Sequence, residues 1–200
     1  MQSWREECAV FGIWNHPEAS RLAYLGLYAL QHRGQEASGI VSLHEENSQE
    51  VHLEHKGFGL VHDVFKETDL DRLKGKAAVG HNRYSTTGQN ELFNIQPLKA
   101  VLFNGPVSLA HNGNIVNAHL LRRDLQGMGS IFQGTNDTEI LLHLAARNRS
   151  DNLIDCLKQE LLKLDGAFSL VLMTHDKMIG VRDPHGFRPL VLGKIKHDAG

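Results

Sequence analysis

A cysteine near the start of the sequence, Cys8 in WREECAVFGIW, has the chemistry of a nucleophile. A thiol attacks carbonyl carbon as its thiolate, and an unperturbed pKa of about 8.5 leaves little thiolate at neutral pH. No histidine close by in sequence is an obvious base. Cleavage before Cys8 would free an α-amine of pKa about 7.7–8.0 on the same residue, which could take the proton. Because buried cysteines are often inert, Cys8 alone also fits a plain core residue.

Three further segments contain groups that could bind or stabilise a reacting substrate. Asn112 and Gly113 in AHNGNI could aim a side-chain amide and a backbone N–H at one oxyanion, or form an ordinary Asn-Gly turn. Arg83 in GHNRYSTTG could clamp a carboxylate with two N–H groups, or lie on the surface. Asp137 in TNDTE could pair with a substrate ammonium, or cap a helix.

The remaining polar residues point to no metal site. The chain has 13 histidines but contains neither CxxC nor HExxH, so we expect none. Gly34 in QHRGQEASG would leave the backbone open to contact at the end of a helix.

Hydrophobic periodicity predicts the elements that must hold these residues. Blocks of strands and helices joined by hairpin-like turns favour an α+β layered fold. Asn117 is expected to cap the helix that follows it, and 106–115 to run into a tight Asn/Gly turn. The predicted strands are 8–14, 38–43, 51–55, 76–84, 106–115, 167–174, 177–183 and 188–193, and the predicted helices are 19–34, 117–126, 135–147 and 151–164.

Composition is that of one globular domain. The 200 residues are 41% hydrophobic and 22% charged, with a formal net charge of −2. This balance indicates no nucleic-acid partner, and no apolar run approaches the roughly 20 residues that span a bilayer. The short start MQSWREE is not a secretory signal, so we expect a cytoplasmic chain in which Cys8 and Cys156 are reduced. The sequence stops straight after a predicted strand, which suggests a piece of a longer protein.

Seven motifs, in order, resemble the glutaminase domain of the amidophosphoribosyltransferases, which are N-terminal-nucleophile hydrolases. The resemblance covers nearly the whole chain and implies a four-layer αββα sandwich. It also implies a propeptide at 1–7 and a glutaminase domain at 8–200, truncated at its C-terminal end, with the phosphoribosyltransferase domain absent. The motifs are EECAVFGIW, LQHRGQEASGI, GFGLVHDVF, GHNRYSTTG, AHNGNIVNA, TNDTEILL and RDPHGFRPLVLG.

The resemblance also assigns roles to individual residues. Cys8 matches the nucleophile released from the propeptide, and residues 83 to about 94 match a loop that closes over glutamine. Two positions depart from the usual pattern: Ala9 stands where glycine is usual, and Asn82 where threonine is common. The other matches are Arg83 for the glutamine α-carboxylate, Asp137 for its α-amine, Asn112 and Gly113 for the oxyanion hole, and Arg33 and Gly34 for the helix end beside the nucleophile.

The activity implied is hydrolysis of glutamine to supply ammonia to phosphoribosylpyrophosphate, giving 5-phosphoribosylamine in the first committed step of purine biosynthesis. No cofactor is expected in this chain; the full-length enzyme is expected to need Mg²⁺, and relatives with a propeptide often hold a 4Fe–4S cluster. A homo-oligomer is expected at full length. Two alternatives stay open: a related amidotransferase making glucosamine-6-phosphate or asparagine, and a non-catalytic scaffold with the same fold.

Overall fold

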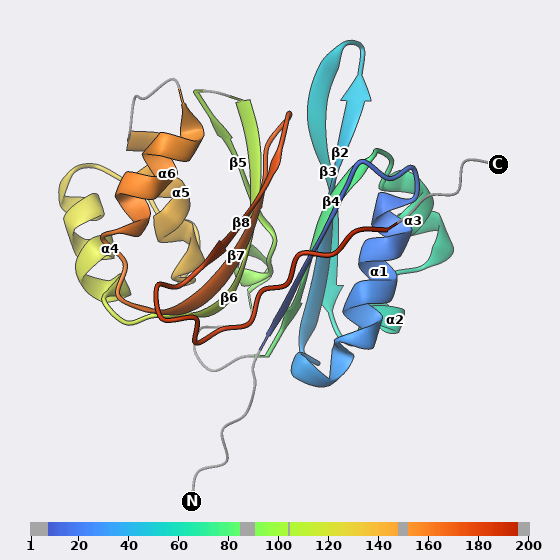
Figure 1. Cartoon of the computed structure of the whole chain (residues 1–200), viewed down its shortest axis with the longest axis horizontal. Coiled ribbons are helices and arrows are strands. Elements are labelled where there is room, and N and C mark those ends of the chain that lie inside the picture. Colours follow the sequence, from blue (N-terminus) through green and yellow to red (C-terminus); the bar gives the residue numbers. More distant parts are fainter. Residues whose placement is uncertain (1–7, 85–90, 104, 148–151, 196–200) are drawn as a thin grey trace, which may run out of the picture.

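Two four-stranded antiparallel sheets pack face to face, and each carries helices on its outer face (Figure 1). The computed structural model describes residues 8–84, 91–103, 105–147 and 152–195. The expected four-layer αββα sandwich is confirmed. The proposed propeptide, 1–7, lies outside the described residues.

The first sheet has the strand order β1-β4-β2-β3 and is covered by α1. Alternate residues of β4 face opposite sides, as the period of a strand requires. Gly80 leaves room for Leu27 of α1, whereas Val79 packs toward the other sheet. The elements of this half are β1 (Ala9–Trp14), α1 (Ala19–Ala29), the 3₁₀ turn η1 (Gln31–Arg33), β2 (Ala37–Glu46), β3 (Gln49–Phe58), α2 (Val61–Val64), α3 (Glu67–Arg72) and β4 (Ala77–Arg83).

The second sheet has the order β5-β6-β7-β8 and is covered by α5 and α6. Strand β6 is long, and β5 pairs only with its first half, from Gly105 to Leu109. The second half of β6 therefore has a strand neighbour on one side, β7. The elements are η2 (Leu92–Asn94), β5 (Leu98–Leu102), β6 (Gly105–Ile115), α4 (Ala118–Gly127), α5 (Thr138–Arg147), α6 (Leu153–Leu161), β7 (Gly166–Met173) and β8 (Met178–Arg182).

Apolar side chains separate all four layers. One cluster lies between the first sheet and its helices, around Leu27 and Ile40, and another between the second sheet and α5 and α6, around Leu109 and Ile140. A third lies between the two sheets, around Val79. Burial of these side chains contributes most of the driving force for folding, and it fixes the two sheets relative to each other.

Several local predictions are wrong. Residues 188–193 form no strand, and the pair Asn112 and Gly113 lies within β6 rather than in a turn. Asn117 precedes α4, but its side chain does not cap the helix; it bonds to the backbone of Lys163 and Asp165 instead. Strand β5 and the short helices α2 and α3 were not predicted, because none has a long periodic pattern.

Cys8 and Cys156 form no disulfide. Among the described residues, no three His, Cys, Asp or Glu side chains gather in a way that would hold a metal ion. In the same part of the chain, no helix is long and apolar enough to cross a membrane.

Candidate active site

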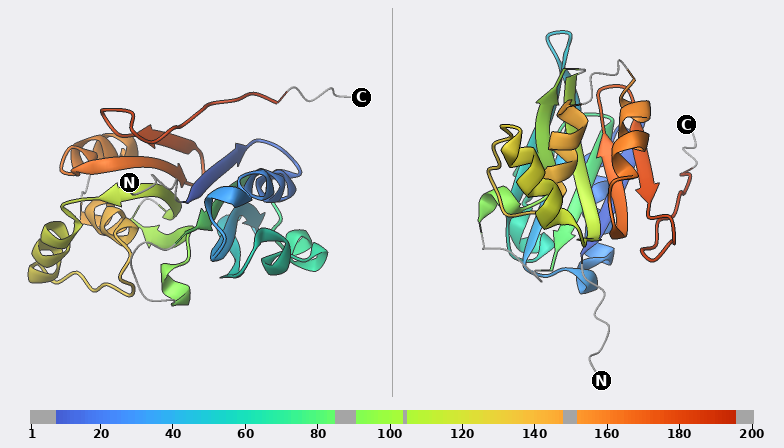
Figure 2. Two further views of the ribbon diagram at one scale, coloured as in Figure 1. Left: turned by 90° about the horizontal axis from the view of Figure 1, so that it is seen from below. Right: turned by 90° about the vertical axis from the view of Figure 1, so that its left-hand side faces the viewer.

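The candidate residues meet at one edge of the sandwich, between the two sheets. Strand β1 starts there, and β4 and β6 end there (Figures 1 and 2). The pairing of Ala9 with Asn82 brings the start of β1 beside the end of β4, so Cys8 lies next to Arg83. Strands β4 and β6 then approach across the space between the sheets.

Arg33 holds the backbone of Cys8 at both ends. The Cys8 N–H donates to the Arg33 carbonyl at 3.0 Å, and the Arg33 Nε donates to the Cys8 carbonyl at 3.1 Å. Cys8 has a φ of 66°, a conformation that is uncommon for residues other than glycine. The clamp from Arg33 therefore fixes the cysteine in a backbone conformation that the chain would not favour by itself.

The sulfur of Cys8 points at the residue that follows β4. The Tyr84 N–H lies 3.5 Å from the sulfur, and the Tyr84 carbonyl lies 3.6 Å from it. The N–H can donate to the sulfur and the thiol can donate to the carbonyl, so the two contacts hold the sulfur beside the end of β4. The side chain is half-buried, so a substrate can reach it.

Gly34 lets the helix-end segment lie against β4. A Cβ on Gly34 would stand 2.8 Å from the Asn82 carbonyl carbon and 2.9 Å from that of Arg83. No larger residue fits without moving the strand that carries Arg83. Asn82, the unusual residue at its position, donates to the Leu27 carbonyl at 2.7 Å and accepts from Ser38 at 3.0 Å, so it ties α1 and β2 to β4.

Arg83 and Asn112 each bury a polar atom that lacks a hydrogen-bond partner among the described residues. The atoms are Nη1 of Arg83 and Oδ1 of Asn112, on side chains that are 7% and 3% exposed. Burial of an unpaired charge is costly, so an anionic group beside Arg83 would be favoured. The amide of Asn112 is likewise available to a ligand.

The backbone of β6 presents a row of three N–H groups on the side where β5 is missing. The His111 N–H donates to the Gln96 side chain at 2.7 Å, and the Ile115 N–H donates to the Asp137 carboxylate at 3.0 Å. The N–H of Gly113, midway between them, points the same way, since alternate residues of a strand present N–H groups to the same side.

In the part of the chain that the structure describes, no strand pairs with the Gly113 N–H. Phe168 is the opposite residue on β7. Its carbonyl accepts from the Asp183 N–H at 2.8 Å, and its own N–H donates to the Asp183 carboxylate at 3.3 Å. Gly113 has a φ of 150°, and a Cβ there would lie 2.1 Å from the Ala167 carbonyl oxygen. Glycine is therefore required, and its N–H is directed at the edge where a developing oxyanion could accept it.

The Asp137 carboxylate lies beside this row, just before α5. One oxygen accepts from Ile115, and the other lies 3.5 Å from the His111 Nδ1. Burial by itself would raise the pKa of Asp137, but the hydrogen bond and charge of His111 and the backbone N–H groups of Ile115 and Thr138 outweigh it and hold the pKa below its usual value. The carboxylate is thus charged at neutral pH and can pair with a cation.

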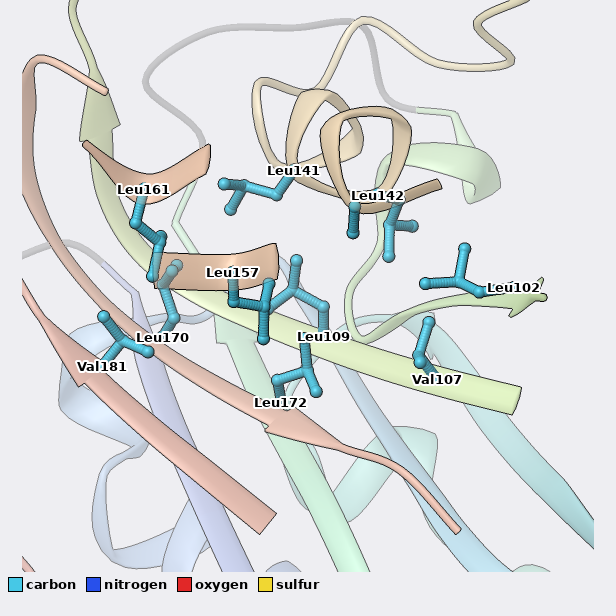
Figure 3. Close-up of a pocket in the computed structure, with 11 residues that line it drawn as sticks. Leu102, Val107, Leu109, Leu141, Leu142, Leu157, Leu161, Leu170, Leu172 and Val181 are labelled. Atoms are coloured by element: carbon cyan, nitrogen blue, oxygen red, sulfur yellow. The ribbon is translucent and has the colours of Figure 1, made fainter. Parts of the chain in front are cut away.

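A separate cavity of about 10 Å³ lies in the apolar core between the second sheet and helices α5 and α6 (Figure 3). It is lined by leucine, valine and alanine side chains such as Leu109, Leu157 and Leu170. A gap of this size and lining stays dry and offers no polar partner to an amino-acid substrate. It belongs to the packing of the core.

The structure therefore brings Cys8, Arg33, Gly34 and Arg83 together and sets Asn112 and Gly113 on the facing strand. Asp137 is joined to the same row of N–H groups through Ile115. The predicted closing loop, 83 to about 94, falls partly on residues 85–90, which lie outside the described residues.

Sequence reasoning missed three residues of the site. They are Tyr84, which acts through its backbone, and Gln96 and His111, which hold β6 and Asp137. A backbone donor has no side-chain signature, and Gln96 contacts His111 across a distance that no local pattern reveals. His111 could have been noticed as a polar residue inside a strand otherwise apolar on that face.

Comparison with known proteins gives a consistent family. The model of a family described as a glutamine amidotransferase domain matches residues 81–199. The chain is 50% identical over 195 residues to amidophosphoribosyltransferase 2, chloroplastic, of Arabidopsis thaliana, covering 98% of this chain and 34% of that protein. It is 45% identical over 192 residues to the amidophosphoribosyltransferase of Staphylococcus aureus strain MRSA252, and this match covers 96% of this chain and 38% of that protein.

Two solved structures share the fold at substantial identity. One, described as the structure of the allosteric regulatory enzyme of purine biosynthesis, gives a TM-score of 0.84 at 47% identity. The other, glutamine phosphoribosylpyrophosphate amidotransferase from B. subtilis complexed with ADP and GMP, gives a TM-score of 0.82 at 46% identity. Each match covers 90% of this chain and 38% of the other. The chain thus spans little more than a third of the length of these relatives.

Proposed function

Because the chain belongs to the glutamine amidotransferase domain family, we propose that it hydrolyses the side-chain amide of glutamine and releases ammonia. One observation carries the proposal: a thiol, a guanidinium with one buried nitrogen that has no described partner, and a backbone N–H with no described strand partner meet at one edge of the sandwich. Amide hydrolysis by a cysteine needs a nucleophile, a group that holds the substrate and donors for the oxyanion.

Substrate binding follows from the charges of the site. Arg83 takes the α-carboxylate of glutamine with its guanidinium, and Asp137 takes the α-ammonium. The side chain of glutamine then reaches toward Cys8, where Arg33 and Gly34 form the adjoining wall. Holding the amino acid at two charged ends orients the amide for attack, which replaces a bimolecular encounter by a reaction of bound groups.

In the reaction, the Cys8 sulfur bonds to the amide carbon while its proton passes to the α-amine of Cys8. The amide oxygen becomes an oxyanion, which accepts hydrogen bonds from the Asn112 side chain and the Gly113 N–H. When the tetrahedral intermediate collapses, the C–N bond breaks and the amine returns the proton to the leaving nitrogen, giving ammonia. Water then hydrolyses the thioester, so glutamate leaves and the thiol is restored.

The α-amine becomes a base only after the bond between Glu7 and Cys8 is cut. The nitrogen of Cys8 already donates to the Arg33 carbonyl, and that contact would hold the freed amine beside its own sulfur. An amine of pKa about 7.7–8.0 is matched to proton transfer near neutral pH.

In the whole protein, we propose that the ammonia reacts with phosphoribosylpyrophosphate to give 5-phosphoribosylamine. The names of the relatives support this acceptor over those of an amino-sugar or asparagine enzyme. A need for Mg²⁺ and a 4Fe–4S cluster in the whole protein likewise remains part of the proposal. A homo-oligomer and a cytoplasmic location remain part of the proposal.

Intact-mass measurement combined with a glutaminase assay tests the central claim. The active protein is expected to lack Met1–Glu7 and to release ammonia from glutamine, and Cys8→Ala is expected to release none. A chain that keeps its first seven residues and still hydrolyses glutamine at full rate would contradict the role of the α-amine. A chain that keeps them, and whose thiol no glutamine analogue labels, would instead favour the scaffold.

A further inference from the structure

The backbone of His111 is anchored from both sides of the sandwich. Its N–H donates to the Gln96 side chain at 2.7 Å, and its carbonyl accepts from Nε2 of His81 on β4 at 3.1 Å. Burial lowers the pKa of His81 to about 3, so its ring stays neutral, and the bond to the His111 carbonyl selects the tautomer with the proton on Nε2. The position of His111 is thus fixed relative to the strand that carries Arg83.

The ring of His111 is directed at the start of α5. Its Nδ1 lies 3.0 Å from the Thr138 hydroxyl and 3.5 Å from an oxygen of Asp137. The side chain is 1% exposed, and its Nε2 is buried with no partner among the described residues. The polar interactions of the ring therefore all run through Nδ1, toward the carboxylate and the hydroxyl beside it.

Asp137 depends on this ring for its placement. One carboxylate oxygen is held by the Ile115 N–H, and the oxygen nearest the ring is also 3.4 Å from the Thr138 hydroxyl. The Ile115 N–H and the His111 ring, both on β6, together with the Thr138 hydroxyl at the start of α5, keep the carboxylate from rotating. If the ring were absent, the oxygen nearest it would keep only the long 3.4 Å contact with the Thr138 hydroxyl, and the carboxylate could turn away from a bound ammonium.

We propose that His111 is a positioning residue for the substrate ammonium, acting through the Asp137 carboxylate and fixing it relative to the Gly113 N–H two residues further along β6. This inference rests on the proposed function. It assigns to one residue the spacing between the group that binds the α-amine and the group that binds the oxyanion, since His111 shares β6 with Gly113 and its ring contacts Asp137 and Thr138 at the start of α5.

Substitutions at His111 can separate this role from simple packing. His111→Asn keeps an N–H close to the place of Nδ1, whereas His111→Leu and the more flexible His111→Met remove it. His52 provides a matched control, since its Nδ1 also bonds a hydroxyl of β6, that of Ser108 at 2.6 Å, and its Nε2 is likewise buried without a described partner. Among the described residues His52 contacts no carboxylate of the site, so His52→Leu reports on the loss of a half-buried ring alone.

The full-length processed protein is assayed with glutamine and with 4-carbamoylbutanoate, which is glutamine without its α-amine. His111→Leu or His111→Met is expected to raise KM for glutamine about 10-fold, as loss of a hydrogen bond to a charged group does, with kcat nearly unchanged. The inhibition constant of 4-carbamoylbutanoate should not move. His111→Asn should restore most of the KM, and His52→Leu should leave both values at those of the original protein. Equal weakening of both ligands, or no rescue by asparagine, would overturn the proposal.

A second measurement separates failure of this inference from failure of the proposed function. Carboxyl ¹³C NMR follows the titration of Asp137 without any substrate. Loss of the ring should raise the pKa of Asp137 in His111→Leu but not in His52→Leu. If the original protein does not hydrolyse glutamine, the proposed function fails, while this titration still decides whether His111 governs Asp137. An unchanged titration in both variants would refute the inference even in an active enzyme.

Discussion

Gly113→Ala tests whether the open backbone N–H of β6 stabilises an oxyanion. A Cβ at this position would lie 2.1 Å from the Ala167 carbonyl oxygen and 2.7 Å from the Phe168 Cα. Contacts below 3.0 Å do not persist, so β6 and β7 must separate by about 0.9 Å. Displacement of a reacting group by about 1 Å can cost 10²-fold in rate, and loss of one oxyanion donor costs about 10²–10³ in kcat. We therefore expect kcat to fall by about 10²–10³, with KM nearly unchanged.

The control is Gly166→Ala, two residues before Phe168 on the partner strand. Gly166 has a φ of 147°, and its Cβ would lie 2.2 Å from the Asn114 carbonyl oxygen, so the steric cost is closely matched. In each variant, placing alanine at positive φ should cost about 1–2 kcal/mol before any movement of the strands.

Thermal unfolding and single-turnover ammonia release are measured on both variants. Similar losses of Tm with a far larger loss of kcat in Gly113→Ala would support the donor role. If both variants lose kcat equally, the effect belongs to strand separation, and the N–H of Gly113 is not an oxyanion donor.

Three other substitutions address the rest of the site. Asn112→Ala should lower kcat by about 10²–10³, and an effect confined to KM would reassign Asn112 to binding of the ground state. Arg83→Lys should raise KM for glutamine at least about 10-fold while kcat changes little, because lysine cannot make the two-point contact with a carboxylate; steady-state kinetics measures both. Burial would raise the pKa of Asp183, but hydrogen bonds from backbone N–H groups lower this pKa overall. The stabilisation of the fold by this carboxylate is therefore complete above the ordinary pKa of about 3.9 and is lost as pH falls through the lower pKa of the folded state. Urea unfolding of Asp183→Asn should accordingly show lower stability at neutral pH and a weaker loss on acidification.

Local sequence patterns predicted the elements that have a clear period. Helix α1 and the strands β1, β2 and β4 were expected because apolar residues recur at helical or alternating spacing. The segment 188–193 has the same composition as a strand, yet it pairs with no described strand, and pairing is a property of the fold rather than of the segment. Val191 and Leu192 are accordingly 88% and 100% exposed.

The Asn-Gly pair shows how a local signal can be overridden. Side by side, Asn112 and Gly113 indicate a hairpin turn. In the fold they continue β6, because pairing with β7 extends as far as Ile115. Glycine tolerates a positive φ in a turn, and here that tolerance lets β6 pass close to the Ala167 carbonyl. The residue types were correctly singled out, but the conformation that gives them a role could not be predicted without the partner strand.

The chemistry of the site arises from a difference in strand length. Because β5 pairs with β6 only as far as Leu109, three N–H groups of β6 would otherwise be left without partners at the edge of a sheet, which is normally unfavourable. A glutamine side chain takes the first, at His111, and a carboxylate takes the third, at Ile115. Both substitutes for β5 act at fixed positions, so the second N–H, at Gly113, is left open beside a charged aspartate. Extending β5 toward Gly113 would require it to begin before Leu98 and would close that position. We infer that the late start of β5 at Leu98 is what allows this edge to bind a substrate.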